Sequence, residues 1–259
     1  MTATVPVPVD SPQVEAIERA TVHAVSPQAQ AEIAGWLLPF DAGTVGRARS
    51  AVPLTHEAPE PAVLQDIEAA YAQQGLPAML RLPVIPAFDV FRSMLNRQGY
   101  REEILTEVHI APAATVRAVS GAEPAELLTT PDPAWASVFL GAGFDPVDGA
   151  SRVQKLGRAT GSLFALIRDG DRPVAAGAAA FSHGWASIHG MRTAQDSRGR
   201  GLAGRVLATL AGAAIARGYN QVFLQVAAEN TTAKSLYRRA GFSPLWSYSY
   251  WRKSAPPQR

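Results

Sequence analysis

One segment, residues 191–242, restricts the possible folds of this chain more than any other. A predicted strand leads into a glycine-rich stretch, Arg198-Gly199-Arg200-Gly201-Leu202-Ala203-Gly204, which opens an amphipathic helix over residues 202–217. Glycines let a backbone approach a ligand closely, and the first turn of a helix presents N–H groups that have no partner within the helix. The pattern therefore predicts a phosphate-binding helix N-terminus.

A second strand and helix follow this loop. The strand is predicted over Val222–Val226, and after Glu229-Asn230 comes a helix that carries Lys234 and Tyr237 and ends at Gly241-Phe242. An asparagine at this position is a typical N-cap, and the tyrosine adds a hydroxyl that can handle a proton. The segment as a whole predicts a pocket for a phosphorylated cofactor with one such hydroxyl beside it.

The two pieces together resemble the GCN5-related N-acetyltransferase (GNAT) superfamily. Its acetyl-CoA loop, Q/R-x-x-G-x-G/A, is matched by residues 198–203, and its later segment, N-x-x-A-x-x-L-Y-x-x-x-G-F, by residues 230–242. The resemblance covers about residues 130–252. It implies an α/β (α+β) fold with a twisted, mixed, mostly antiparallel sheet flanked by helices. It also implies an acetyl-CoA-dependent N-acetyltransferase that acts by direct attack of a primary amine, on a small metabolite or a peptide, in a ternary complex.

The resemblance also assigns roles to the matching residues. A backbone N–H at Met191–Thr193 would stabilise the oxyanion, and Gly190 would permit a bulge there. Tyr237 would protonate the departing thiolate, with a core aromatic as the alternative interpretation. Asn230 would both cap its helix and contact the cofactor. The expected cofactor-binding residues are Met191, Arg192, Thr193, Arg198, Gly199, Arg200, Gly201, Leu202, Ala203, Gly204, Asn230 and Lys234.

The general base is not evident from the sequence. The strand predicted over Trp185–Thr193 contains no Asp or Glu, and His189 is its titratable group with a suitable pKa. We therefore predict His189 as a catalytic residue, with an ordinary hydrogen-bonded strand histidine as the alternative. The closing strand places Trp246, Tyr248 and Tyr250 on one face, where they either line an acceptor cleft or cover the sheet. We favour the second interpretation.

The order of elements recurs along the chain. In the first half, Gly75, a strand at Ala78–Leu82, a helix at Phe88–Gln98 and Gly99-Tyr100 repeat the order that runs from Gly218 to Gly241-Phe242. We predict a tandem arrangement, with a degenerate GNAT-like domain over 1–125 and the catalytic domain over 126–259. The prolines and glycine around residues 121–133 indicate a linker.

The first half lacks the features of a phosphate site. Its helix over Ala62–Gln74 follows Thr55-His56-Glu57-Ala58-Pro59-Glu60-Pro61, which has two prolines without N–H donors, two glutamates and no glycine. We therefore expect this half to be unable to hold acetyl-CoA.

Composition excludes several classes of function. A net charge of +2, from 24 basic and 22 acidic residues, argues against a nucleic-acid partner. The absence of cysteine excludes disulfides and an acetyl-cysteine intermediate, and no metal site is predicted. No apolar run approaches the roughly 18 residues that span a bilayer, and residues 1–10 lack the features of a signal peptide. We expect a cytoplasmic protein with a frayed N-terminus and no membrane partner. The sequence does not predict the oligomeric state.

Two alternative functions remain. Gly199-x-Gly201-x-x-Gly204 also matches the dinucleotide fingerprint of an NAD-binding oxidoreductase. However, polar residues separate the loop from the preceding strand, and too little chain follows Glu229 for that fold. A triphosphate loop is excluded because no Gly-Lys-Ser/Thr follows. The second alternative is a non-catalytic acyl-CoA-binding sensor: the missing carboxylate base favours it and Tyr237 argues against it.

Overall fold

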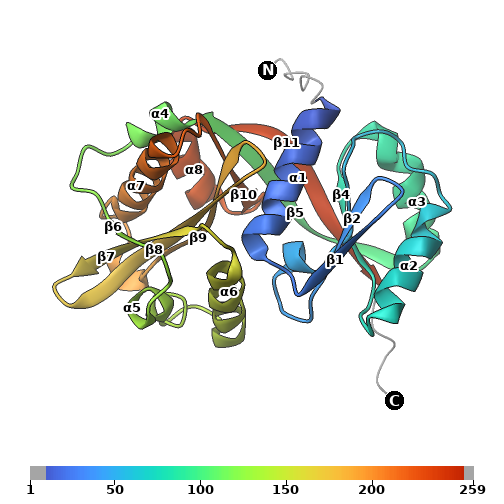
Figure 1. Cartoon of the computed structure of the whole chain (residues 1–259), viewed down its shortest axis with the longest axis horizontal. Coiled ribbons are helices and arrows are strands. Elements are labelled where there is room, and N and C mark those ends of the chain that lie inside the picture. The colour runs from blue at the N-terminus through green and yellow to red at the C-terminus, as the bar shows by residue number, and fades with distance from the viewer. Residues whose placement is uncertain (1–9, 254–259) are drawn as a thin grey trace.

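The computed structural model describes residues 10–253, in which helices and strands alternate along the chain (Figure 1). The elements of the first half are α1 (Ser11–Val25), β1 (Ala29–Ile33), β2 (Trp36–Phe40), the 3-10 turn η1 (Gly46–Ala48), β3 (Val52–Pro53), α2 (Val63–Gln73), β4 (Met79–Pro83), the 3-10 turn η2 (Pro86–Phe88), α3 (Asp89–Arg97), β5 (Tyr100–Pro112) and α4 (Ala113–Arg117). The expected frayed N-terminus falls on residues 1–9, outside the described part.

The second half continues from residue 126. Its elements are β6 (Glu126–Leu128), α5 (Pro133–Ser137), α6 (Pro146–Arg158), β7 (Leu163–Asp169), β8 (Arg172–Ser182), β9 (Trp185–Thr193), the 3-10 turn η3 (Gln195–Ser197), α7 (Leu202–Ala216), β10 (Gln221–Ala227), α8 (Thr231–Arg239) and β11 (Ser243–Lys253). None of the helices within residues 10–253 is long and apolar enough to span a membrane.

The strands form two sheets. The smaller one is β1-β2-β3, and the larger has eight strands in the order β4-β11-β5-β10-β9-β8-β7-β6. Among these eight strands, β9 and β10 form the one parallel pair and every other neighbouring pair is antiparallel. The predicted fold class, a mixed but mostly antiparallel sheet flanked by helices, is confirmed.

The two halves exchange strands at the centre of the larger sheet. Strand β5 of the first half lies between β10 and β11, and β11 of the second half lies between β4 and β5. Figure 1 shows these long strands running from the α7 side of the molecule to the α2 side. The sheet is therefore continuous across the halves, and the division of the chain into domains 1–125 and 126–259 stays a prediction.

The predicted repetition of elements is present. The order α2-β4-α3-β5 in the first half recurs as α7-β10-α8-β11 in the second. Gly75 and Gly218 follow the first helix of each unit with φ of +67° and +82°, and Gly99 and Gly241 follow the second helix with φ of +85° and +89°. These left-handed positions are ones that glycine adopts without steric cost, so the same residue ends the same helix in both units.

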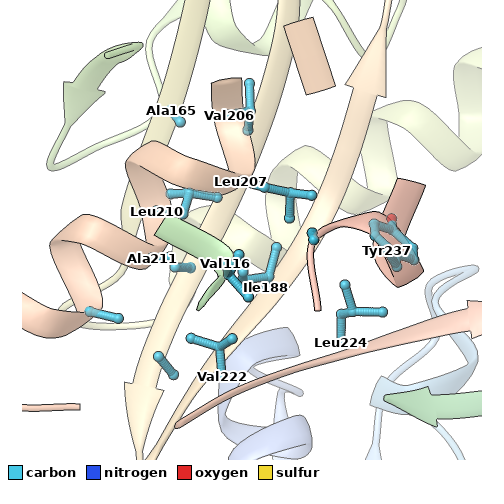
Figure 2. Packing of buried hydrophobic residues seen from close by; sticks show 14 of the residues in the cluster. Val116, Ala165, Ile188, Val206, Leu207, Leu210, Ala211, Val222, Leu224 and Tyr237 are labelled. Atoms are coloured by element: carbon cyan, nitrogen blue, oxygen red, sulfur yellow. The ribbon is translucent and has the colours of Figure 1, made fainter. Parts of the chain in front are cut away.

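The core of the second half lies between α7 and the sheet. Figure 2 shows Val206 of α7 beside Ala165 of β7, and Leu207 and Leu210 of α7 in the same cluster as Ile188 of β9 and Leu224 of β10, with Tyr237 of α8 at its edge. Val206, Leu207 and Leu210 are fully buried, and burial of each such side chain contributes about 1.5–3 kcal/mol. This packing fixes the start of α7 and the position of Tyr237 relative to the sheet.

The sequence prediction missed helices α1 and α6 and was wrong about one proline. Asp10 and Asp145 cap α1 and α6 with their carboxylates, and a proline follows each cap in the first turn. Pro133, assigned to a linker, is instead the first residue of α5, capped by Asp132. Helix α1 packs against β8 and β9 of the second half, so the start of the described chain supports the second half.

Candidate active site

The glycine loop holds the start of α7 open. Gly199 and Gly201 have φ of +76° and +75°, and a Cβ atom at either would meet nothing within 4 Å. Within the described residues no side chain caps α7, and its first turn carries no acidic residue. Its first helical hydrogen bond runs from Arg205 N to Gly201 O, which leaves three N–H groups without an acceptor in the helix, those of Leu202, Ala203 and Gly204. The helix start can therefore accept an anion.

The corresponding helix of the first half has a closed start. The backbone N–H groups of Val63, Leu64 and Gln65 donate to the carbonyls of residues 60–62 at 3.2, 3.4 and 3.1 Å. The first turn of α2 also contains Asp66. Donors already used, next to a carboxylate, disfavour a phosphate here. This contrast supports the expectation that the first half does not hold acetyl-CoA.

Strands β9 and β10 pair over three residues and then lose their pairing. The parallel register runs from Val222↔Ala186 to Leu224↔Ile188. Beyond it, the register of β9 with β8 shifts between Ala178↔His189 and Ala176↔Arg192, which inserts one extra residue into β9. Gly190 lies there with φ +61°, so the predicted bulge is confirmed. Met191, next to it, packs against the α7 core.

Tyr237 lies on the α7 side of this opening. Its side chain is 7% exposed and packs edge-on against Phe242 with ring centroids 5.9 Å apart. Burial raises the pKa of the Tyr237 hydroxyl to about 12, so it stays protonated at neutral pH and can donate its proton. In the matching unit of the first half, Leu95 stands four residues before Gly99, as Tyr237 stands four residues before Gly241, and Leu95 is buried.

Asn230 caps α8 as predicted. Its Oδ1 accepts a hydrogen bond from Ala233 N at 3.1 Å. Its contact with the cofactor stays a prediction.

The predicted basic ligands already have protein partners. Arg200 donates to Asp169 at 2.7 Å with both side chains about half exposed. Arg198 contacts the Thr193 carbonyl at 3.5 Å. Lys234 is held by Glu107 at 2.5 Å and by the Ala228 carbonyl at 3.2 Å. The exposed Arg200 pair is weak enough to exchange for a phosphate, whereas Lys234 is already neutralised.

The Arg192 side chain already has protein partners. Its guanidinium lies 4.5 Å from the centre of the Phe144 ring and 3.6 Å from Asp148. A role for Arg192 in binding the cofactor therefore rests on its backbone.

His189 is buried on the opposite side of the opening from Tyr237. It is 3% exposed, and Arg47 donates to its Nδ1 at 3.4 Å. Burial and the charge of Arg47 lower the pKa of His189 well below 6.5, so the ring is neutral. With Nδ1 accepting from Arg47, the proton lies on Nε2, which has no partner in the described residues. The ring is thus poorly placed to accept a proton from an ammonium.

A pocket of about 360 Å³ lies on this side of the sheet. Its lining residues come from the η1 segment, α6 and strands β4, β5, β10 and β11, and include Arg47, Arg49, Arg152, Glu103, Ile104, Gln225, Tyr248, Tyr250 and Arg252. A smaller cavity lined by His189 and Gly190 shares Val45, Arg47 and Arg152 with it. The smaller cavity therefore lies between this pocket and the place where β9 and β10 part.

Sequence reasoning found only part of this pocket. Trp246, Tyr248 and Tyr250 lie on one face and are buried with α1 residues, as favoured, and two of them also form the pocket wall. The Tyr248 hydroxyl donates to Gln225 at 2.8 Å, and Gln225 donates to Thr21 at 2.9 Å. Arg47 and Arg49 were missed because they follow no motif.

Comparisons with known proteins agree with this geometry. The profile of the family described as "Probable histone acetyltransferase Rv0428c C-terminal" matches residues 11–251. A protein of Bacillus subtilis (strain 168), "Uncharacterized N-acetyltransferase YobR", is 32% identical over 87 residues, which cover 34% of this chain and 35% of that protein. The chain thus spans about a third of the length of this curated relative.

Two solved structures share the fold over nearly the whole chain. A GCN5-related N-acetyltransferase from Kribbella flavida has a TM-score of 0.68 at 16% identity, covering 94% of this chain and 96% of that one. A tandem GNAT protein from the clavulanic acid biosynthesis pathway has a TM-score of 0.58 at 13% identity, covering 98% and 99%.

The fold and the family match define the class of protein. The chain belongs to the Rv0428c C-terminal family and is a member of the GNAT superfamily.

Proposed function

We propose that this protein transfers an acetyl group from acetyl-CoA to a primary amine by direct attack in a ternary complex. The observation that carries the proposal is the open start of α7 beside the parting of β9 and β10. Tyr237 lies on one side of the sheet there and a pocket on the other. Two reactants could then meet through the opening from opposite faces of the sheet.

The residues of α7 and β9 fit the cofactor. The free N–H groups of Leu202–Gly204 would hold its pyrophosphate, and the missing side chains at Gly199 and Gly201 leave room for it. Bound acetyl-CoA would supply the acetyl group as an activated thioester. A backbone N–H within Met191–Thr193 would stabilise the oxyanion that forms on the carbonyl.

The proposed transfer moves two protons, one from the Tyr237 hydroxyl and one from the acceptor amine. A carbon–nitrogen bond would form and the carbon–sulfur bond would break. The Tyr237 hydroxyl would give its proton to the leaving thiolate and regain one from water, and the nitrogen would release one proton to water. The geometry of His189 disfavours it as the acceptor of that proton, because Arg47 occupies its free lone pair. We therefore propose that the amine enters in its neutral form and loses its proton to water, with His189 shaping the wall.

The proposed function includes two classes of acceptor, a small-molecule amine and a peptide amine. The family description names histone acetylation, and a histone acceptor would be a lysine-rich peptide. A cytoplasmic location and the absence of a nucleic-acid partner also stay predictions.

Calorimetric titration with acetyl-CoA, with NAD as the control ligand, tests the proposal. We expect one micromolar site per chain for acetyl-CoA and none for NAD. Gly201→Glu should abolish binding, because its side chain would place a carboxylate where the phosphate sits. Gly184→Glu is the matched control: Gly184 also has a positive φ (+77°) and open space around it, at the far end of β9, so it carries the same backbone strain.

The alternatives give different results. If Gly201→Glu and Gly184→Glu lose acetyl-CoA affinity equally, the loss comes from backbone strain and not from a disrupted phosphate site. Two sites per chain would contradict the closed first half. Acetyl-CoA binding without acetylation of any amine would favour the non-catalytic sensor. The lack of a carboxylate base on β9 is the sequence feature that supports that alternative.

A further inference from the structure

The pocket opposite Tyr237 has an excess of positive charge. Four arginines line it, with Glu103 as the acidic residue of the lining. Arg252 is paired with Glu103 at 2.8 Å, and Arg152 is paired with Asp148 at 2.6 Å. Two of the four arginines are therefore already neutralised.

Arg47 and Arg49 contact only neutral groups. Arg47 donates to His189 Nδ1 and to Gln225 Oε1, each at 3.4 Å, and Arg49 donates to the Gly43 carbonyl at 3.2 Å. Within residues 10–253 no carboxylate lies at ion-pair distance from either guanidinium. The buried carboxylate nearby, Glu18, is paired with Arg81 at 2.5 Å. Two half-buried cations with unused N–H donors thus face the pocket, which is the donor set that binds carboxylates and phosphates.

A strained residue in the pocket wall is a second, independent observation. Ile104 has φ +44°, a left-handed conformation that a β-branched residue adopts at a cost. Its side chain is 60% exposed, so packing does not explain the strain. The extra residue lies where the register of β5 with β11 shifts, opposite Tyr248 and Tyr250. The bulge accounts for the left-handed backbone, and bulges of this kind are over-represented next to active sites.

The size of the pocket and its wall favour a small ligand. Tyr248 and Tyr250 pack edge to face with ring centroids 5.5 Å apart. A volume of about 360 Å³ lies near the lower limit for small-molecule sites.

We infer that the acceptor is a small primary amine that also carries an anionic group, a carboxylate or a phosphate, and that Arg47 and Arg49 bind this group. The inference rests on the proposed function and specifies its acceptor. Once the anionic group is bound, the amine would be directed at the parting of β9 and β10. A lysine-rich peptide would be repelled by the same arginines.

Matched acceptors test the inference. Ornithine against 1,4-diaminobutane, and phosphoethanolamine against ethanolamine, differ in the anionic group and so separate carboxylate from phosphate recognition. A lysine-rich peptide is the third arm. We expect kcat/KM to be at least about 10-fold higher for one member that carries the anionic group than for its partner without it, because a charge-assisted hydrogen bond contributes about a 10- to 100-fold effect.

Variants identify the arginines. Arg47→Gln and Arg49→Gln should each remove most of the preference, because KM should rise more for the anionic acceptor than for its partner without the anionic group. Arg97→Gln on α3 is the control, because Arg97 is exposed and lies outside the pocket lining. Acetyl-CoA affinity should be unchanged in all three variants.

The failure of the inference is distinct from failure of the proposed function. Equal turnover of the paired amines, or preference for the peptide, would overturn the inference and leave the transferase intact. If no amine is acetylated, titration with inorganic phosphate at saturating CoA still tests whether Arg47 and Arg49 bind an anion. Binding that Arg47→Gln removes and Arg97→Gln keeps supports the anion site, and no binding by the wild type refutes it.

Discussion

A buried ion pair fixes the loop that carries the two free arginines. Asp41, at the start of this loop, and Lys155 of α6 are 1% and 3% exposed, with Nζ and a carboxylate oxygen 2.6 Å apart. The Gly43 N–H also donates to Asp41 at 2.7 Å, and Arg158 lies 3.3 Å away. We predict that Lys155→Met loosens this loop and destabilises the protein.

The size of the effect follows from burial. Removing one member of a fully buried pair costs about 3–5 kcal/mol because the other charge is left without its partner. Asp41 keeps two weaker partners, so we expect about 2–4 kcal/mol in the free energy of unfolding. Lys253→Met is the matched control: its pair with Glu68 has the same 2.6 Å separation, but the side chains are 51% and 31% exposed. That change should cost less than about 1 kcal/mol.

The pair also predicts how stability depends on pH. Burial alone raises the pKa of Asp41, but the hydrogen bonds from Lys155 and Gly43 and the nearby charges outweigh it and hold the pKa below 3.8. A carboxyl whose pKa is lowered by folding stabilises the protein above its unfolded pKa, and the contribution is lost as the pH falls through the folded pKa. The stability gap between the wild type and Asp41→Asn/Lys155→Met should therefore be constant at neutral pH and narrow below about pH 4.

Urea unfolding followed by tryptophan fluorescence measures these differences, and acetylation assays measure their consequence. Lys155→Met should raise KM for the acceptor while acetyl-CoA affinity stays within about 3-fold, because α7 is not touched. The reasoning is refuted if Lys155→Met costs no more stability than Lys253→Met. A loss of acetyl-CoA affinity equal to the loss for the acceptor would refute the assignment of the loop to the acceptor side.

Three further substitutions test separate parts of the site. Tyr237→Phe should lower kcat about 100-fold with acetyl-CoA affinity nearly unchanged, and wild-type kcat in this variant would remove Tyr237 as the acid. Gly190→Ala should destabilise by about 1–3 kcal/mol in urea unfolding, since its Cβ would lie 2.8 Å from Leu156 Cδ1 at a positive φ; an unchanged midpoint would contradict the need for glycine in the bulge. Ile104→Asn should leave stability unchanged or raise it by up to about 1 kcal/mol, because asparagine tolerates the left-handed backbone; a clear loss would show that Ile104 is not strained.

The cofactor side of the site could be predicted because its chemistry is local in sequence. Backbone donors, the glycines that expose them and the cap of the next helix all lie within residues 198–230, so their spacing alone specifies the geometry. Helix boundaries near these residues were also close, since Gly218 ends α7 with the expected left-handed backbone. The bulge at Gly190 could be predicted in the same way, because a glycine within a strand is a local signal for a bulge.

The acceptor side could not be predicted because it is assembled from distant segments. Arg47 reaches His189 and Gln225 across more than 140 residues of sequence, and no pattern marks such a contact. The exchange of β5 and β11 between the halves could not be predicted either. The residue pattern that identifies a strand does not specify which neighbouring strand it pairs with. Helices α1 and α6 carry a local signal, an aspartate followed closely by proline, that is typical of a helix N-terminus.

The distribution of these residues explains why the chain has a first half that lacks a phosphate loop. That half supplies β5, without which β10 and β11 would have no common neighbour, and it supplies Arg47 and Arg49 of the pocket. In the proposed function, the second half binds the cofactor, and a loop of the first half, fixed on α6, selects the acceptor. Changes in that loop could then alter the acceptor without touching the cofactor motif. In that proposal, the glycine loop at residues 198–204 would specify the reaction, and the loop at residues 41–49 would specify the acceptor.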